Sequence, residues 1–227
     1  MKRLKMTHDV LATGPLQCNC QILGDEDSKT ALVVDPGDDI PEIEQLLERR
    51  GLRVAKILFT HAHFDHIGRA AQLKRSSGAP TWLHKLEIPI LESLDQQAAW
   101  IGVEPGEKVE IDHYYDEGDV VEFAGHELRV LFTPGHSPGS VSFFIPSLER
   151  LIAGDVLFRD SIGRTDLPGG DTQQLLDSIR DKVLTLPDDT AVFPGHGPGT
   201  TIGRERRQNP FLEGLSEHAE SALDDLT

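Results

Sequence analysis

The chain has 227 residues, of which 38% are hydrophobic and 26% charged, and this composition is typical of a globular protein rather than a disordered one. The formal net charge of −16 argues against binding of DNA or RNA through phosphates, which requires a basic surface. No apolar stretch approaches the ~20 residues of a membrane span, and the opening residues lack the apolar core of a signal peptide. We therefore expect a cytoplasmic protein with neither nucleic-acid nor membrane partners.

The first half of the chain alternates short apolar strands with helices. The apolar spacing predicts two strands joined by a turn in residues 8–23, a buried strand at 30–37, a helix at 40–51, a strand at 54–60 and a helix at 67–80. This order is an α/β pattern, and open α/β sheets bind their ligands beyond the C-terminal ends of strands.

The second half contains more strands. We predict a largely helical segment at 84–102, an irregular polar stretch up to Gly118, a hairpin at 119–135, two strands within 140–155, a helix at 171–186 and a last strand at 190–197. No low-complexity linker interrupts the chain. We therefore predict a single domain over residues 1–227, built from two similar halves, with a short helical tail from about residue 204.

The segment FTHAHFDHIG (59–68) follows a predicted strand and contains His61, His63, Asp65 and His66. In H-x-H the two imidazoles can converge on one ion, and the D-H that follows points toward a neighbouring position. A solvated polar loop is the alternative, and so many donors in so short a window argue against it.

Three further donors lie at or after strand ends: His136 in TPGHSPG, Asp155 in IAGDVLF and His196 in FPGHG. Glycines and prolines beside two of them let the backbone turn sharply. Seven imidazole and carboxylate donors suit zinc, iron or manganese, and two ions that share one bridging carboxylate would use all seven.

The two cysteines, Cys18 and Cys20, form a C-x-C pair. A disulfide between residues two apart on a strand would be strained, so we expect both thiols to be reduced. Binding of a soft metal by this pair is a weaker alternative.

The motifs H-A-H-F-D-H (61–66), P-G-H-S-P-G (134–139), G-D (154–155) and P-G-H-G (194–197) together resemble the metallo-β-lactamase superfamily. SIGRTDLPGGD (161–171) and TIGRERRQNPFL (201–212) resemble its hydroxyacylglutathione hydrolase branch, also called glyoxalase II-like. The resemblance implies an α/β fold of the four-layer αββα sandwich type, with a dinuclear metal site in a cleft at one edge of its two sheets.

The same resemblance implies a role for each donor. His61, His63 and His136 would hold the first ion, Asp65, His66 and His196 the second, and Asp155 would bridge both. We expect two divalent ions, zinc in the first place, with iron or manganese as alternatives. Members of the branch carry a longer C-terminal helical extension that supplies basic residues to glutathione, and we expect that part of the substrate site to be missing or rebuilt here.

The function implied is hydrolysis of an acyl thioester, S-(2-hydroxyacyl)glutathione, to a 2-hydroxy acid and glutathione by a hydroxide that bridges the two ions. Asp65 would both ligate an ion and orient this hydroxide. Asp35, in a strand-end D-P-G, is a candidate hydrogen-bond partner for a ligand imidazole. Arg164, Arg204, Arg206 and Arg207 are candidates for binding substrate carboxylates, because arginine pairs with them in a bidentate way.

Other members of the superfamily offer alternative functions. A mononuclear-iron persulfide dioxygenase would use His61, His136 and Asp155, and it shares the G-R-T-D and E-R-x-x-N-P motifs. That group typically reads N-P-R where this chain has N-P-F at 209–211. Another dinuclear hydrolase, such as a lactonase, has the same ligands. A β-lactamase with a cysteine ligand is disfavoured because Asp155 stands at the cysteine position, and a flavodiiron module is disfavoured because His63 replaces its glutamate.

Overall fold

The computed structural model describes residues 6–215. The chain divides into two compact units, unit 1 (residues up to 116, with 121–127) and unit 2 (117–120 and from 128 onward). Among the described residues, no helix has the length and apolar character needed to cross a membrane.

Unit 1 is built on a six-stranded sheet with the order β1-β2-β3-β4-β5-β6. β1 to β3 are antiparallel, whereas β3 to β6 run parallel. The strands are β1 Met6–Thr13, β2 Cys18–Asp25, β3 Thr30–Val34, β4 Arg53–Leu58, β5 Thr81–His84 and β6 His113–Tyr115. The helices are α1 Ile40–Arg50, α2 Phe64–Ile67, α3 Ala70–Ser77, α4 Ile88–Glu92 and α5 Leu94–Ile101, with a 3₁₀ turn at Lys85–Glu87.

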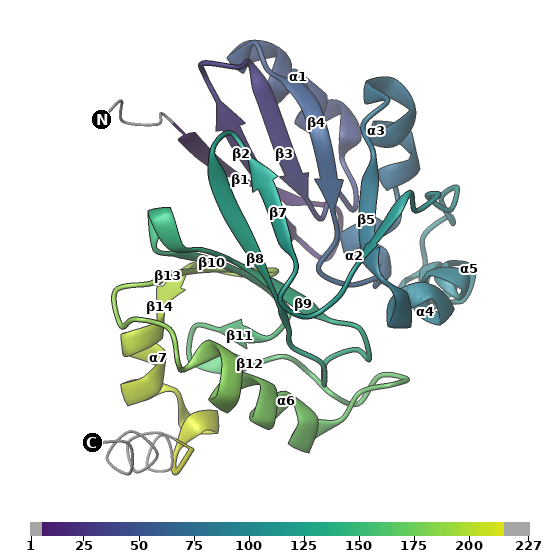
Figure 1. The fold of residues 1–227 in the computed structure, drawn as a ribbon. Coiled ribbons are helices and arrows are strands. Elements are labelled where there is room, and N and C mark those ends of the chain that lie inside the picture. Colours follow the sequence, from purple (N-terminus) through teal and green to yellow (C-terminus); the bar gives the residue numbers. More distant parts are fainter. Residues whose placement is uncertain (1–5, 216–227) are drawn as a thin grey trace. The chain divides into compact units, whose positions relative to one another are not determined.

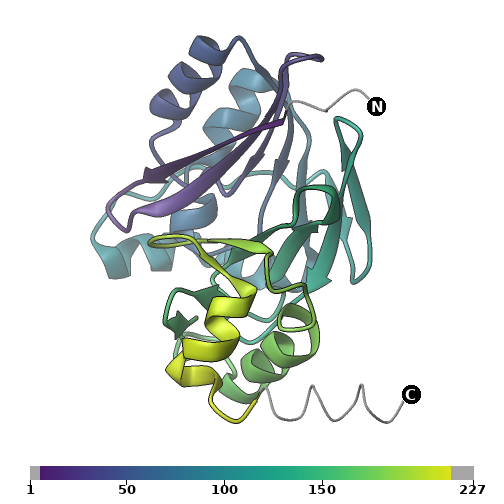
Figure 2. The same cartoon turned by 90° about the vertical axis from the view of Figure 1, so that its left-hand side faces the viewer.

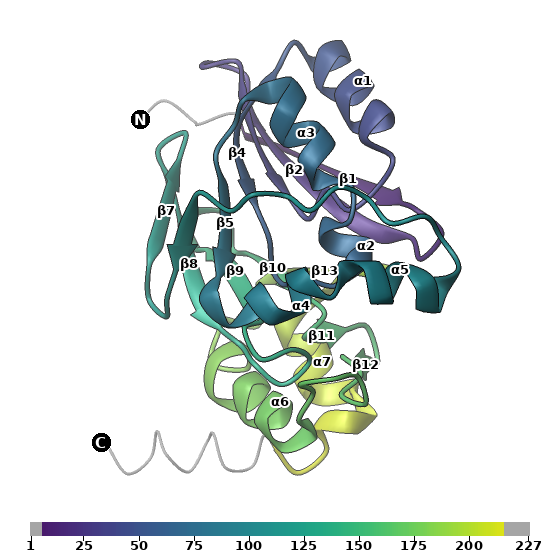
Figure 3. The same cartoon turned by 90° about the vertical axis from the view of Figure 1, so that its right-hand side faces the viewer.

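Helices α1 and α3 cover one face of this sheet (Figure 1, Figure 3). Parallel strands need a crossover connection, and α1 supplies it between β3 and β4. Ile40, Ile43 and Leu47 fall on one side of α1 and pack into the core with β-strand residues such as Ile57. Gly51 ends the helix in the left-handed conformation at φ 65°.

The second sheet has the order β14-β13-β10-β9-β8-β7. Its strands are β7 Val120–Phe123, β8 His126–Phe132, β9 Val141–Ile145, β10 Arg150–Gly154, β13 Ala191–Pro194 and β14 Thr200–Thr201, and a separate small hairpin joins β11 Leu157–Phe158 to β12 Ser161–Ile162. The helices are α6 Thr172–Ser178, which continues as a π-helical turn Ile179–Val183, and α7 Ile202–Gln208, with 3₁₀ turns at Pro146–Leu148 and Pro210–Leu212.

Helices α6 and α7, green and yellow in Figure 2, pack on one face of this sheet in unit 2. Leu175 and Ile179 from the α6 segment and Ile202 from α7 meet Leu151 and Val192 of the strands in one apolar cluster. The side chain of Asp171 caps α6 by accepting from the amide of Gln174 at 3.0 Å.

The predicted strands and helices are confirmed, with differences where short elements meet. The helix predicted at 67–80 begins later, as α3 at Ala70, and a short helix α2 lies before it in the predicted ligand loop. Between them the amide of Arg69 donates to the carbonyl of Gly37 instead of continuing the α2 ladder. The segment 84–102 is likewise broken at Ser93. β5, β6, β14 and the β11–β12 hairpin were not predicted, and β6 lies in the stretch expected to be irregular. Within the predicted tail α7 is helical, and residues 216–227 lie outside the described residues.

Gly37 offers a test of how tightly the loop after β3 packs against α2. An alanine Cβ at this position would come 1.6 Å from the carbonyl oxygen of Asp65. We expect Gly37→Ala to lower the free energy of unfolding by about 3 kcal/mol, measured by urea denaturation. Gly51→Ala is the control: its Cβ would meet nothing within 4 Å, and its left-handed backbone predicts a loss of about 1 kcal/mol. Equal losses at both positions would contradict the close packing.

Candidate metal centre

Four of the predicted donors converge within unit 1. His61 and His66 are fully buried, and the centroid of the His61 ring lies 4.0 Å from that of His66 and 4.7 Å from that of His63. The Nε2 atom of His66 lies 3.7 Å from Oδ2 of Asp65. These side chains follow β4 in the loop and short helix that precede α3, as the sequence predicts.

The backbone that carries these donors is held by side chains from other elements. Alternate amides donate to buried acceptors, Thr60 to Asp35 Oδ1 at 2.8 Å, Ala62 to Glu87 Oε2 at 2.8 Å and Phe64 to Gln97 Oε1 at 2.9 Å. Glu87 is fully buried and Gln97 is 8% exposed. Because the amides of residues 60, 62 and 64 are held, His61 and His63 between them have little freedom to move.

Asp35 orients one of the imidazoles. Its Oδ2 atom lies 3.0 Å from Nδ1 of His66 and accepts from the hydroxyl of Thr60 at 2.7 Å. A carboxylate can only accept, so Nδ1 of His66 carries the proton and Nε2 is the nitrogen available as a ligand. A histidine whose second nitrogen donates to a carboxylate is the usual arrangement at protein metal sites.

The other three predicted donors converge within unit 2. Oδ2 of Asp155 lies 3.6 Å from Nε2 of His136 and 3.6 Å from Nε2 of His196. Nδ1 of His136 donates to the carbonyl of Arg164 at 2.7 Å, which again leaves Nε2 for a ligand role. Residue 163 must be glycine here, because a Cβ would come 2.0 Å from the carbonyl oxygen of Asp155.

The spacing and chemistry of these donors fit divalent ions in each unit by itself. The distances of 3.6 to 3.7 Å between imidazole nitrogen and carboxylate oxygen exceed a hydrogen bond. Two ligands on one tetrahedral ion, with bonds of ~2.1 Å, stand about 3.4 Å apart, close to what is seen. Imidazole and carboxylate together suit zinc, iron and manganese.

The candidate substrate arginines are engaged in ion pairs. Arg164 makes two bonds of 2.7 Å to the carboxylate of Asp166, both exposed, and this pairing lowers the pKa of Asp166 to about 2. Arg206 and Arg207 both pair with Asp188, and Arg207 does so at 2.9 Å. Their role in substrate binding stays a prediction.

Arg204, the remaining candidate, pairs with Asp160 at 2.8 Å. In this segment, however, the buried polar residues are Glu205 (0% exposed) and Asn209 (3%). Sequence analysis did not single out either one.

Cys18 lies close to two of the predicted metal ligands, which the sequence does not indicate. Its sulfur, a carboxylate oxygen of Asp65 and a ring nitrogen of His66 all lie within 4.8 Å of one another. Burial raises the pKa of this thiol to about 12. Cys20, also buried, belongs to the apolar core.

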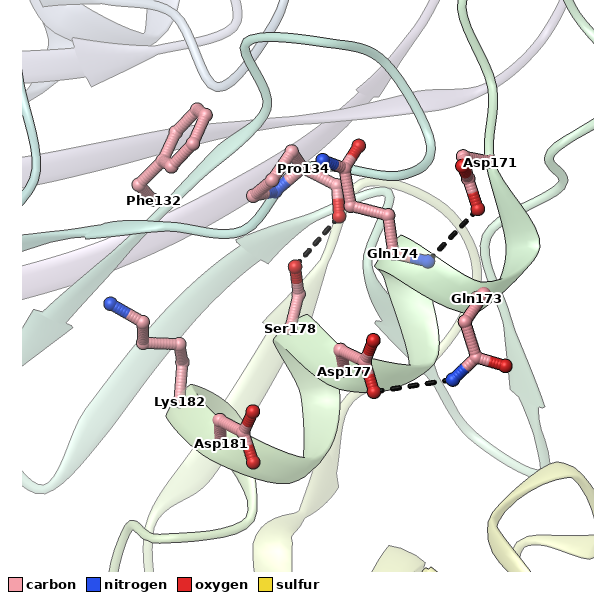
Figure 4. A pocket seen from close by; sticks show the side chains of 9 residues that line it. All are labelled: Phe132, Pro134, Asp171, Gln173, Gln174, Asp177, Ser178, Asp181 and Lys182. Carbon is pink, nitrogen blue, oxygen red and sulfur yellow. Dashed lines mark hydrogen bonds between the residues drawn. The ribbon is translucent and has the colours of Figure 1, made fainter.

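A cavity of about 450 Å³ lies on unit 2. Figure 4 shows its lining, which includes Asp171, Asp177, Asp181 and Lys182. On this lining the hydroxyl of Ser178 donates to the carbonyl of Pro134 at 2.7 Å, while Asp181 pairs with Arg180 and Lys182 with Glu117 outside it. None of the predicted site residues lines it.

The sequence matches a known protein family. The model of the metallo-β-lactamase superfamily matches residues 13–196, a span that holds all seven predicted metal ligands. The chain belongs to the metallo-β-lactamase superfamily. It is a metal-dependent hydrolase of that superfamily, and the predicted fold class is confirmed.

Individual relatives are similar over nearly the whole chain. Hydroxyacylglutathione hydrolase GloC of Haemophilus influenzae is 38% identical over 213 residues, which cover 93% of this chain and 100% of the relative. The crystal structure of BLEG-1 B3 metallo-β-lactamase is 41% identical with a TM-score of 0.86, covering 92% of this chain and 100% of that one. The crystal structure of TTHA1623 in a di-iron-bound form is 41% identical with a TM-score of 0.82, covering 90% and 100%.

Gln97 tests the support of the ligand loop. Gln97→Ala removes the acceptor for the amide of Phe64, which costs ~1–3 kcal/mol when a buried donor loses its partner. We expect zinc affinity to fall about tenfold, measured by competition with a chromophoric chelator. Gln96→Ala, on the exposed side of the same helix α5, is the matched control. Equal zinc affinity of the two variants would show that the loop does not depend on this bond.

Proposed function

We propose that the chain hydrolyses acyl thioesters, with S-(2-hydroxyacyl)glutathione as the substrate class. The observation that carries the proposal is the convergence of His136 and His196 on one carboxylate oxygen of Asp155. This arrangement fits the proposed role of Asp155 as a ligand placed between two imidazoles. The similarity to a hydroxyacylglutathione hydrolase over that relative's entire length supports the substrate class.

The proposed centre combines the donors of both units, and this combination rests on membership of the superfamily. His61, His63 and His136 would hold one divalent ion, Asp65, His66 and His196 a second, and Asp155 would bridge them. The ions are proposed to be zinc, with iron or manganese as alternatives, and a di-iron form of a relative at 41% identity supports a two-metal site. The bound ions would supply Lewis acidity, lowering the pKa of water from ~15.7 to about 7 and polarising a carbonyl.

The residues of the chain act on the attacking water and on the products. The carboxylate of Asp65, partly exposed, accepts a hydrogen bond from the water and sets its direction of attack. The water oxygen bonds to the thioester carbon, the carbon–sulfur bond breaks, and an acid and a thiol result. A thiol has a pKa of about 8.5, so it can leave as a thiolate without a dedicated acid residue.

Three other reactions remain as competing outcomes. The persulfide dioxygenase would need one iron, whereas the proposed hydrolase needs two ions. A lactonase would use the same donors on an oxygen ester. Because the chain is similar to BLEG-1 B3 metallo-β-lactamase, β-lactam hydrolysis is the third alternative to test.

The decisive experiment combines metal analysis with a panel of substrates for the purified protein. We expect two metals per chain and cleavage of S-lactoylglutathione, because the bridging carboxylate serves both ions. Asp155→Asn should lower metal affinity or activity by about 100-fold while the protein stays folded. Oxygen uptake with glutathione persulfide at one iron per chain, or hydrolysis of a lactone or a chromogenic β-lactam without thioester cleavage, would overturn the proposal.

Arg164 tests whether glutathione is the thiol. Its guanidinium is 62% exposed and pairs with Asp166, so it can reach a substrate carboxylate, while its carbonyl orients His136 whatever the side chain. We expect Arg164→Ala to raise KM for a glutathione thioester about tenfold and to leave KM for a short neutral thioester unchanged. Arg180→Ala removes a similar exposed arginine–aspartate pair, with Asp181, and is the control. Equal effects on both substrates would assign Arg164 a structural role only.

A further inference from the structure

Cys18 opens β2 and points into polar surroundings inside unit 1. The strand places it opposite Thr13, whose hydroxyl donates to the carbonyl of Cys18 at 3.2 Å. Its side chain is fully buried. The sulfur lies within 4.8 Å of donor atoms of both Asp65 and His66, which stand far along the chain in α2.

Cys18 and Cys20 are both buried but differ in their neighbours. Cys20 is equally buried and lies in the apolar cluster with residues such as Ile22 and Val33, and this cluster does not include Cys18. Cys18 instead has an imidazole and a carboxylate for neighbours. Without a metal this buried thiol is neutral and hydrogen-bonds with His66, and a cation at this place would displace its proton.

The spacing of Asp65 and His66 within this group also fits a cation. The bond from Nδ1 of His66 to Asp35 fixes the ring with Nε2 on the side of Asp65, and the separation of 3.7 Å between Nε2 and Oδ2 is too long for a hydrogen bond. It is close to the spacing of about 3.4 Å for two ligands on one tetrahedral ion. The sulfur of Cys18 is the third donor around the same point.

We propose that Cys18 is a thiolate ligand of the divalent ion held by Asp65 and His66. On binding, the sulfur–metal bond forms and the thiol proton passes to solvent. A thiolate beside an imidazole and a carboxylate favours zinc over manganese, since soft ligands select thiophilic ions. Cys18 is thus a residue that determines which metal the site takes. The inference rests on the metal binding in the proposed function and not on its substrate.

The test uses the zinc-loaded full chain and its Cys20→Ser variant. The chain has two cysteines, so a thiolate bound to zinc in Cys20→Ser comes from Cys18. Zinc X-ray absorption should show a sulfur neighbour at about 2.3 Å in both proteins. Cobalt-loaded samples should show a thiolate-to-cobalt charge-transfer band in the near ultraviolet. Zinc or cobalt bound without a sulfur neighbour in the wild-type chain or in Cys20→Ser would overturn the proposal.

Cys18→Ser gives the second measurement. We expect the charge-transfer band to disappear and zinc affinity to fall about tenfold, while manganese affinity stays within about twofold. An intact band, or equal losses for zinc and manganese, would overturn the proposal. Should this variant fail to fold, the Cys20→Ser spectra decide alone. Thioesterase assays on the same samples separate the two ideas: a sulfur neighbour without thioester cleavage refutes the proposed function and leaves Cys18 as a ligand.

Discussion

The hydrogen bonds of the buried Asp35 carboxylate hold the part of the candidate metal centre that lies in unit 1. Its backbone has a left-handed φ of 54°, and its amide donates to the carbonyl of Leu58 at 3.0 Å, which joins the end of β3 to the end of β4. Its side chain then accepts from the amide and hydroxyl of Thr60 and from Nδ1 of His66. Burying a charge costs several kcal/mol unless it is fully hydrogen-bonded, and these three bonds supply that compensation. One residue thereby fixes two strand ends, the start of the ligand loop and the tautomer of one imidazole.

Sequence patterns predicted most of the fold because the apolar periods are strong where elements are long. The runs that became β2, β3 and α1 each have a clear period and a turn signal at their end. β5 and β6 were missed because four and three residues are too few to show a period. The break between α2 and α3 depends on a backbone hydrogen bond from Arg69 to Gly37. A local sequence pattern does not predict a contact between residues so far apart in the chain.

The candidate site shows the same division between local and remote information. The donor types and their places at strand ends could be read from the sequence, because each lies in a short motif. The residues that hold the loop could not, since Glu87 and Gln97 reach amides 25 and 33 positions earlier in the chain. Cys18 was underrated for the same reason, because its neighbours Asp65 and His66 are adjacent only in the fold.

The segment 201–212 contains buried polar residues as well as arginines. Glu205 accepts from the amide of Asp160 at 2.8 Å, and the side-chain amide of Asn209 donates to the carbonyl of Ser161 at 3.0 Å. Both bonds hold the β11–β12 hairpin, whose next residues bring the carbonyl of Arg164 to Nδ1 of His136. The segment 201–212 therefore helps to position His136, one of the predicted metal ligands, by fixing this hairpin. The arginines of this segment are candidates for binding substrate, and its buried residues Glu205 and Asn209 help to orient the imidazole of His136.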